Sequence, residues 1–129
     1  MFCTNPHFYI LNKGLNSGKP LYEPCTNCFV IIFSNHEDKE SYYWLAYSLW
    51  RSKFWHQSLV GSVIPFLRLS EFKSAYSHKS KIMIQEHDEH LKNTKALKLL
   101  EQTENHFHKN LTHISELRRV ILYRYTNKN

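Results

Sequence analysis

Glycine and proline are scarce in this sequence, and neither occurs in its second half. The chain has three glycines and four prolines, and the last of each are Gly61 and Pro65. These two residue types are the strongest local breakers of regular structure. Their absence from residues 82–125 therefore favours one long, uninterrupted helix there.

Cysteine and long apolar runs are also lacking. Cys3, Cys25 and Cys28 form an odd count with no disulfide framework. No apolar run approaches the roughly 20 residues that span a bilayer, and the N-terminus shows no signal peptide. Hydrophobic residues make up 42% and charged residues 22%, which is typical of a globular chain. We expect a reduced, cytoplasmic protein that does not associate with membranes.

No catalytic constellation is visible. Gly14, Gly18 and Lys19 suggest a phosphate-binding loop, but they lack the Walker spacing and the Ser/Thr that follows its lysine. Residues 12–20 are better interpreted as a hairpin loop. We therefore do not expect an enzyme.

The pair Cys25-x-x-Cys28 has two possible chemical roles. A structural zinc needs four ligands, and only Cys3 and His7 could complete the set. A thioredoxin-like pair would lie on a strand-to-helix turn, whereas this pair precedes a strand. We expect reduced thiols without metal.

Histidine spacing gives no metal site either. His87 and His90 are neighbours on a helix, with Glu86 four residues before His90, but no third convergent ligand is identifiable. We expect no metal and no cofactor.

Large apolar side chains concentrate in residues 41–72, which contain all three tryptophans. Ser34-x-x-Glu37 matches a capping box and predicts a helix from Ser34 to Phe54. Its apolar stripe is wider than one ordinary amphipathic face, which predicts burial on two sides. We expect the following residues of this helix to be largely buried: Trp44, Leu45 and Leu49.

Three segments have the composition of strands. Residues 7–11 (HFYIL) predict a short strand, and residues 29–33 (FVIIF) a buried one. Residues 63–69 are strand-like, with Pro65 restricting them to an edge or bulge. Residues 70–81 are a short helix or a loop. The predicted fold class is α+β, with a small, mostly antiparallel sheet, one central aromatic-rich helix and a long C-terminal helix.

The C-terminal helix is expected to span about 30–40 residues and to carry a coiled-coil-like stripe. Such a helix overhangs a small domain, which predicts a homodimer through antiparallel or crossed helices, or a helical hairpin broken near Asn105. We expect one domain over residues 1–129, with an α+β core at 1–80 and the helix or hairpin at 81–125. The stripe is interrupted by Glu104 and Arg118, and its apolar members are Leu97, Leu100, Phe107, Leu111, Ile114 and Ile121.

Positive charge is uneven along the chain. The formal net charge is +6, of which +1 lies in residues 1–65 and +5 in residues 66–129. This favours an anionic partner, and the alternative is a solvated helix surface. The leading hypothesis is a non-catalytic nucleic-acid-binding module; the alternative is a protein–protein interaction or structural module. The candidate nucleic-acid-binding residues are Arg51, Lys53, His56, Ser62, Arg68 and Lys73.

Three strings carry a family resemblance: PLYEPCTNCFV, YYWLAYSLWRSKFW and LVGSVIPFLRL. With them the chain resembles a family of uncharacterised proteins from gut Bacteroides and their mobile elements. The resemblance covers most of the chain and implies no activity or functional residue.

A second, more distant resemblance covers residues 41–123. Ser52-Lys-Phe-Trp55 ends a helix, a short apolar strand follows at 61–69, and a long helix runs over about 84–123. This order is similar to the target-recognition domains of type I restriction specificity subunits. That resemblance implies DNA binding, mostly through loops, and a coiled-coil spacer helix.

Overall fold

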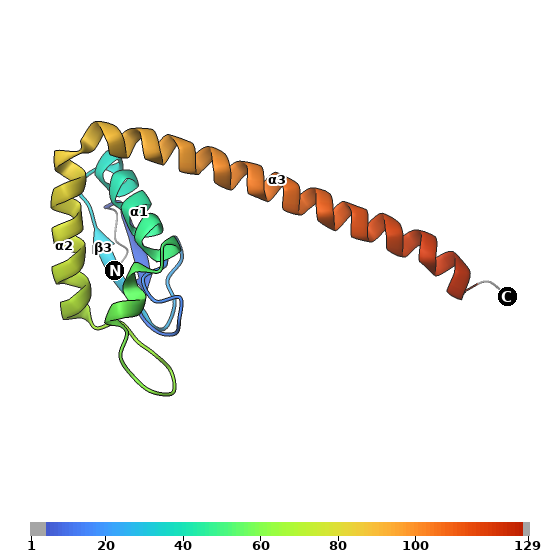
Figure 1. Ribbon diagram of the computed structural model, residues 1–129, viewed down its shortest axis with the longest axis horizontal. Coiled ribbons are helices and arrows are strands. Elements are labelled where there is room, and N and C mark those ends of the chain that lie inside the picture. The colour runs from blue at the N-terminus through green and yellow to red at the C-terminus, as the bar shows by residue number, and fades with distance from the viewer. Residues whose placement is uncertain (1–4, 128–129) are drawn as a thin grey trace. The chain divides into compact units, whose positions relative to one another are not determined.

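The computed structural model describes residues 5–127 and confirms the α+β class. Three short strands come first, followed by three α-helices and one 3-10 helix (Figure 1). In chain order the elements are β1 (His7–Leu11), β2 (Pro20–Leu21), β3 (Cys28–Ile32), α1 (His36–Arg51), η1 (Phe54–Ser58), α2 (Leu69–Gln85) and α3 (His87–Thr126).

The strands form an antiparallel sheet in the order β2-β1-β3. Ile10 pairs with Pro20, so residues 12–19 connect two antiparallel strands, as the predicted hairpin requires. Strand β3 differs from its prediction as a buried strand, because Val30 and Ile32 are each more than half exposed. Side chains alternate across a strand, and only one face of this edge strand packs on the core.

Helix α1 begins later than its capping box predicts. Asn35, and not Ser34, is the N-cap, and its Oδ1 accepts a 2.8 Å hydrogen bond from the backbone N–H of Asp38. The helix ends at Arg51, before the predicted Phe54, because Lys53 adopts a left-handed conformation with φ 61°. Asparagine competes well with serine for the N-cap position, which explains the one-residue shift.

One cluster of buried side chains joins the sheet to α1, η1 and α2. Trp44 and Leu49 are buried as predicted, whereas Leu45 is only half-buried. The hydroxyl of Tyr76 donates a 2.6 Å hydrogen bond to the carbonyl of Tyr42. Burial, and to a smaller extent the electrostatic interaction with Tyr42, raises the pKa of Tyr76 well above its usual value, so the Tyr76 hydroxyl remains a donor. The cluster comprises Phe8, Ile10, Ala46, Leu49, Trp55, Leu67, Phe72 and Tyr76.

We expect Leu49→Ala to lower the free energy of unfolding by roughly 2–5 kcal/mol, because it removes apolar contacts and leaves a cavity. Denaturant unfolding followed by tryptophan fluorescence reports on this region. Leu15→Ala is the matched control, since Leu15 is 68% exposed and its loss should change stability by about 0.5 kcal/mol or less. Equal effects of the two substitutions would refute the core assignment.

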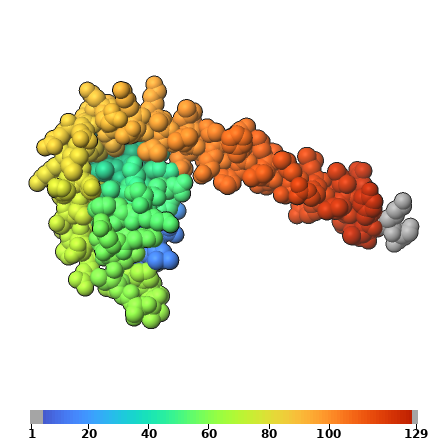
Figure 2. Space-filling model, in the orientation of Figure 1, coloured from blue at the N-terminus to red at the C-terminus, as the bar shows by residue number. Residues whose placement is uncertain are grey.

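Residues 63–69 do not form the predicted strand. Phe66 makes isolated antiparallel bridges to Val60 and Lys13, and α2 already begins at Leu69. Proline at position 65 has no N–H to donate to a ladder, so pairing stops after single bridges. Residues 59–68 form a loop that projects from one end of this part of the fold (Figures 1 and 2).

The chain divides into two compact units, one ending at Leu91 and the other beginning at Lys92. The second unit is the body of α3, which continues through Asn105 without the break that a helical hairpin requires. A long C-terminal helix is therefore confirmed. Every residue from 102 to 127 is exposed.

Candidate nucleic-acid interface

A tight turn at residues 14–18 packs on the indole of Trp55, which is only 1% exposed. The turn closes through the hydroxyl of Ser17, which donates a 2.6 Å hydrogen bond to the carbonyl of Gly14. Gly18 lies directly against the indole, with φ +98°. The turn therefore has a fixed position beside η1.

Two further segments are held against this turn. The backbone N–H of Gly14 donates to the carbonyl of Pro65 at 2.7 Å, and that of Leu67 donates to Asn12 at 2.9 Å. The imidazole Nε2 of His56 lies 3.1 Å from the carbonyl oxygen of Leu15. The β1–β2 connection, η1 and the 59–68 loop therefore meet at one end of the first unit.

All six candidate residues lie on segments at or next to this end, and all are exposed. Arg51 ends α1, and Lys53 occupies the left-handed position before η1. Ser62 belongs to the projecting loop, and Arg68 is the N-cap of α2. The remaining two are His56 in η1 and Lys73 in the second turn of α2.

Trp50 lies at the centre of a small cationic group that the sequence did not single out. The Nζ of Lys19 is 5.1 Å from the centre of its ring, and the guanidinium carbon of Arg51 is 5.6 Å away. Its indole Nε1 donates to Asn16 Oδ1 at 3.3 Å. Because Lys19 is 31 residues before Trp50, no local pattern could have found this contact.

Charge in the first unit is segregated between its two ends. The end just described carries six cationic side chains and one carboxylate, Glu71; we call this surface the basic end. The opposite end, where α1 begins and α2 ends, carries six carboxylates and two cations, Lys39 and Lys81. The cations of the basic end are Lys13, Lys19, Arg51, Lys53, Arg68 and Lys73. The carboxylates opposite are Glu37, Asp38, Glu40, Glu86, Asp88 and Glu89.

Among residues 5–127, no group of three or more His, Cys, Asp or Glu could hold a metal ion. His7 pairs with Ile32 and Cys28 with Leu11, at opposite ends of the β1–β3 ladder. They are about 13 Å apart along the strands, too far to share a zinc. Cys3, the other proposed ligand, lies outside the described residues.

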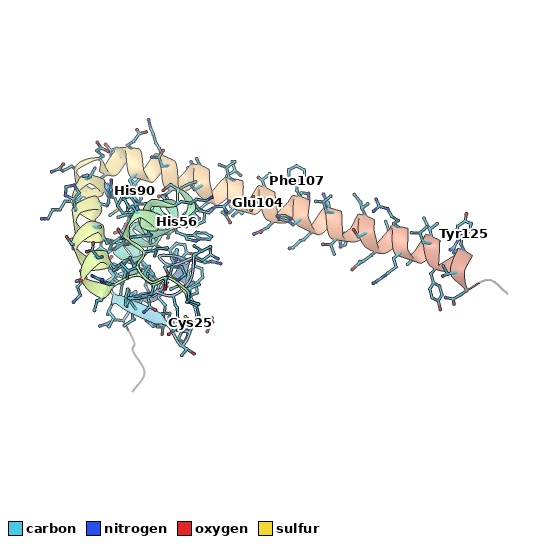
Figure 3. All side chains as sticks on the ribbon, turned by 60° about the horizontal axis from the view of Figure 1, so that its bottom comes forward. Cys25, His56, His90, Glu104, Phe107 and Tyr125 are labelled. Atoms are coloured by element: carbon cyan, nitrogen blue, oxygen red, sulfur yellow. The ribbon has the colours of Figure 1, made fainter. Side chains whose placement is uncertain are left out.

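The histidine at position 90 has a structural partner. Its Nε2 lies 2.9 Å from the carbonyl oxygen of Ser41, which connects the start of α3 to α1. Figure 3 labels this residue at the turn between α2 and α3. The imidazole of His90 is thus engaged with the backbone of α1.

The second unit presents a different kind of surface. Eight residues of α3 follow one another at alternating spacings of four and three and form a stripe that we call the seam. All eight are exposed, and Glu104, Phe107 and Tyr125 project from the helix in Figure 3. The seam comprises Leu100, Glu104, Phe107, Leu111, Ile114, Arg118, Ile121 and Tyr125.

Among residues 5–127, no helix is both long enough and apolar enough to cross a membrane. A family model described as a family of unknown function (DUF6943) matches residues 2–124. No curated protein matches the chain, and no solved structure does. The family match extends over both units and brings with it no activity and no ligand.

Proposed function

The chain belongs to DUF6943, a family of unknown function, and we propose from its surface that the basic end binds the phosphate backbone of nucleic acids without catalysis. The observation that carries this proposal is the segregation of charge within the first unit. A solvated surface mixes both signs, whereas six cations with one carboxylate create a local positive field. Nucleic-acid phosphates are the natural counterpart of such a field.

Two local features support an anionic partner at this end. Arg68 occupies the N-cap position of α2, but no side chain accepts a capping hydrogen bond there. The positive end of the α2 dipole therefore adds to the positive potential of the basic end. Lys53 holds a left-handed position at the end of a helix, where glycine is usually favoured. A lysine that tolerates this conformation is consistent with selection for its charge.

Trp50 gives the basic end an aromatic component. It is the only one of the three tryptophans that is not buried, and it lies between Lys19 and Arg51. An accessible indole can stack on an unpaired base or a sugar, while the flanking cations hold phosphates. The proposal therefore includes single strands as well as duplexes.

We expect the full chain to bind a fluorescent 20-base-pair duplex weakly, with dissociation constants on the order of 10⁻⁴ to 10⁻⁶ M at physiological salt. Arg51→Ala and Lys53→Ala should each weaken binding about equally for all sequences. Each should also reduce the slope of log K against log salt concentration by about one, because one phosphate contact is lost. Fluorescence anisotropy at a series of salt concentrations measures both effects.

Two substitutions that remove the same charge serve as controls. Lys81→Ala acts on the far part of α2, and Lys109→Ala acts on α3; both lysines are exposed. Neither should change the slope. Absence of binding at low salt would refute the proposal. A slope that changes in Lys109→Ala but not in Arg51→Ala would show that α3, and not the basic end, contacts the phosphates.

A protein–protein interaction or structural module is the second candidate, and the exposed seam of α3 favours it. Binding that does not respond to salt would point to this alternative. The proposal retains the finer resemblances as hypotheses: a link to DNA-recognition domains of restriction systems, and an origin in gut Bacteroides or their mobile elements. It also retains a cytoplasmic location, where the thiols of Cys25 and Cys28 would stay reduced.

A further inference from the structure

The seam of α3 is apolar, long and open. Its apolar members are each at least half exposed in the second unit. Twenty-five residues separate Leu100 from Tyr125, so the seam extends about 38 Å along the helix. Exposed apolar stripes of this length mark interaction surfaces, and the alternating four-three spacing is that of a coiled-coil partner.

Two charged residues occur in the seam, and their placement identifies the partner. Glu104 lies seven residues before Leu111, and Arg118 lies seven residues after it. The opposite charges are therefore related by a two-fold axis that passes near Leu111, perpendicular to the helix. Under such an axis, each carboxylate meets a guanidinium within about one helical turn, roughly 5 Å along the helix.

A parallel, in-register pair lacks this complementarity. In that arrangement each seam residue packs beside its own copy. Glu104 would then face the partner's Glu104, and Arg118 would face the partner's Arg118, so two like-charged contacts would lie inside an apolar interface. Like charges so placed cost several kcal/mol. The sequence of the seam thus disfavours the parallel dimer.

We infer that α3 pairs with α3 of a second copy of this chain, antiparallel, with Glu104 opposite the partner's Arg118. The surface is self-complementary, as a two-fold interface requires. Leu111 and Ile114 lie at its centre. The inference is independent of nucleic-acid binding, because it depends on residues of the second unit alone.

Spin labels on the full chain test the orientation. Cysteines are introduced singly at Gln102 and Lys109, which are exposed and off the seam, after the three native cysteines are replaced by serine. In the antiparallel pair, the label-to-label distance at Gln102 should exceed that at Lys109 by roughly 15 Å, because Gln102 is farther from the axis. A parallel pair gives equal distances at the two positions and would overturn the inference.

Charge reversal tests the pairing itself. Glu104→Arg turns each of the two opposite-charge contacts of the antiparallel pair into a contact between two cations and should weaken dimerisation roughly tenfold or more, whereas a parallel pair would only exchange one like-charged contact for another. Adding Arg118→Glu should restore the affinity. Glu116→Arg, which changes the charge equally but lies off the seam, is the control.

Sedimentation equilibrium measures each dissociation constant, and tryptophan fluorescence verifies that the first unit of each variant stays folded. An unaltered dissociation constant for Glu104→Arg would overturn the pairing. A wild-type chain that stays monomeric at high concentration would overturn the whole inference.

Discussion

Gly18→Ala is expected to destabilise the first unit by roughly 2–5 kcal/mol, although it adds a single methyl group. A Cβ at Gly18 would overlap Cδ1 of Trp55 and lie 2.6 Å from its Nε1. The indole ring cannot move away easily, because Trp55 is buried in the core cluster. The φ of +98° adds backbone strain for any residue with a Cβ.

Gly14→Ala is the matched control for this prediction. Gly14 has nearly the same backbone conformation, with φ +92°, but no atom lies within 4 Å of an added Cβ. It should therefore show only the backbone strain, roughly 1–2 kcal/mol. The difference between the two variants in denaturant unfolding isolates the packing contribution of the turn on Trp55. If both variants lose the same stability, the close approach is not a constraint in solution.

The same turn connects stability to the candidate interface. Lys19 follows Gly18 directly and reaches the ring of Trp50, while Leu15 and Asn16 contact His56 and Trp50 through hydrogen bonds. A shift of the turn would therefore displace several groups of the basic end. We expect Gly18→Ala to weaken nucleic-acid binding even where enough folded protein remains to measure it.

Elements with a strong local signal were predictable from the sequence. The aromatic and β-branched composition of residues 7–11 predicted a strand, and the structure buries Phe8 and Ile10 on one of its faces. The absence of Gly and Pro from residues 82–125 indicated a long C-terminal helix, which the structure confirms, although residues 82–85 belong to α2 and the long helix begins at His87. In both cases the deciding information lies within a few residues, so no tertiary context was needed.

Elements that depend on distant partners were not predictable. Residues 63–69 have the composition of a strand, yet Phe66 forms only single bridges, to Val60 and to Lys13. Pro65 has no N–H with which to extend this pairing. Residues 29–33 looked like a buried strand, but only one face of β3 packs on the core, and Val30 and Ile32 on the other face are more than half exposed. Composition reports how apolar a segment is, and it does not report how many layers cover it.

The candidate site likewise contains residues that the sequence predicted and residues that it did not. Its six residues were proposed from charge near one turn of the chain, and the fold brings their segments together. Lys13, Lys19 and Trp50 were missed, since they join the basic end only through contacts across about 30 or more residues of sequence. Segregation of charge between two ends is a property of the tertiary fold, and a count along the chain places the excess instead in residues 66–129.

Leu111→Glu is expected to separate the proposed α3–α3 dimer into monomers. Leu111 lies at the centre of the seam and is 60% exposed in the single chain, so it has no other element of the second unit to pack on. Substitution removes two buried leucine side chains per dimer and places two carboxylates at the axis. The combined cost of about 4 kcal/mol or more corresponds to a dissociation constant raised roughly 1,000-fold.

Light scattering gives the direct measurement. Monomer has a mass of 15.5 kDa, and the wild type should approach twice that value while the variant should not. Gln102→Glu introduces the same charge off the seam and should leave the dimer intact. Circular dichroism adds a second readout, because an isolated helix gains little from propensity alone and α3 should lose helicity once it is unpaired.

Tryptophan fluorescence separates this outcome from general unfolding. All three tryptophans precede α3 and lie in the first unit, so Leu111→Glu should leave their unfolding transition unchanged. A variant that unfolds the first unit would show instead that Leu111 is part of its core. A wild-type chain that scatters as a monomer at high concentration would show that α3 does not need a second copy, and the seam would then belong to a different partner.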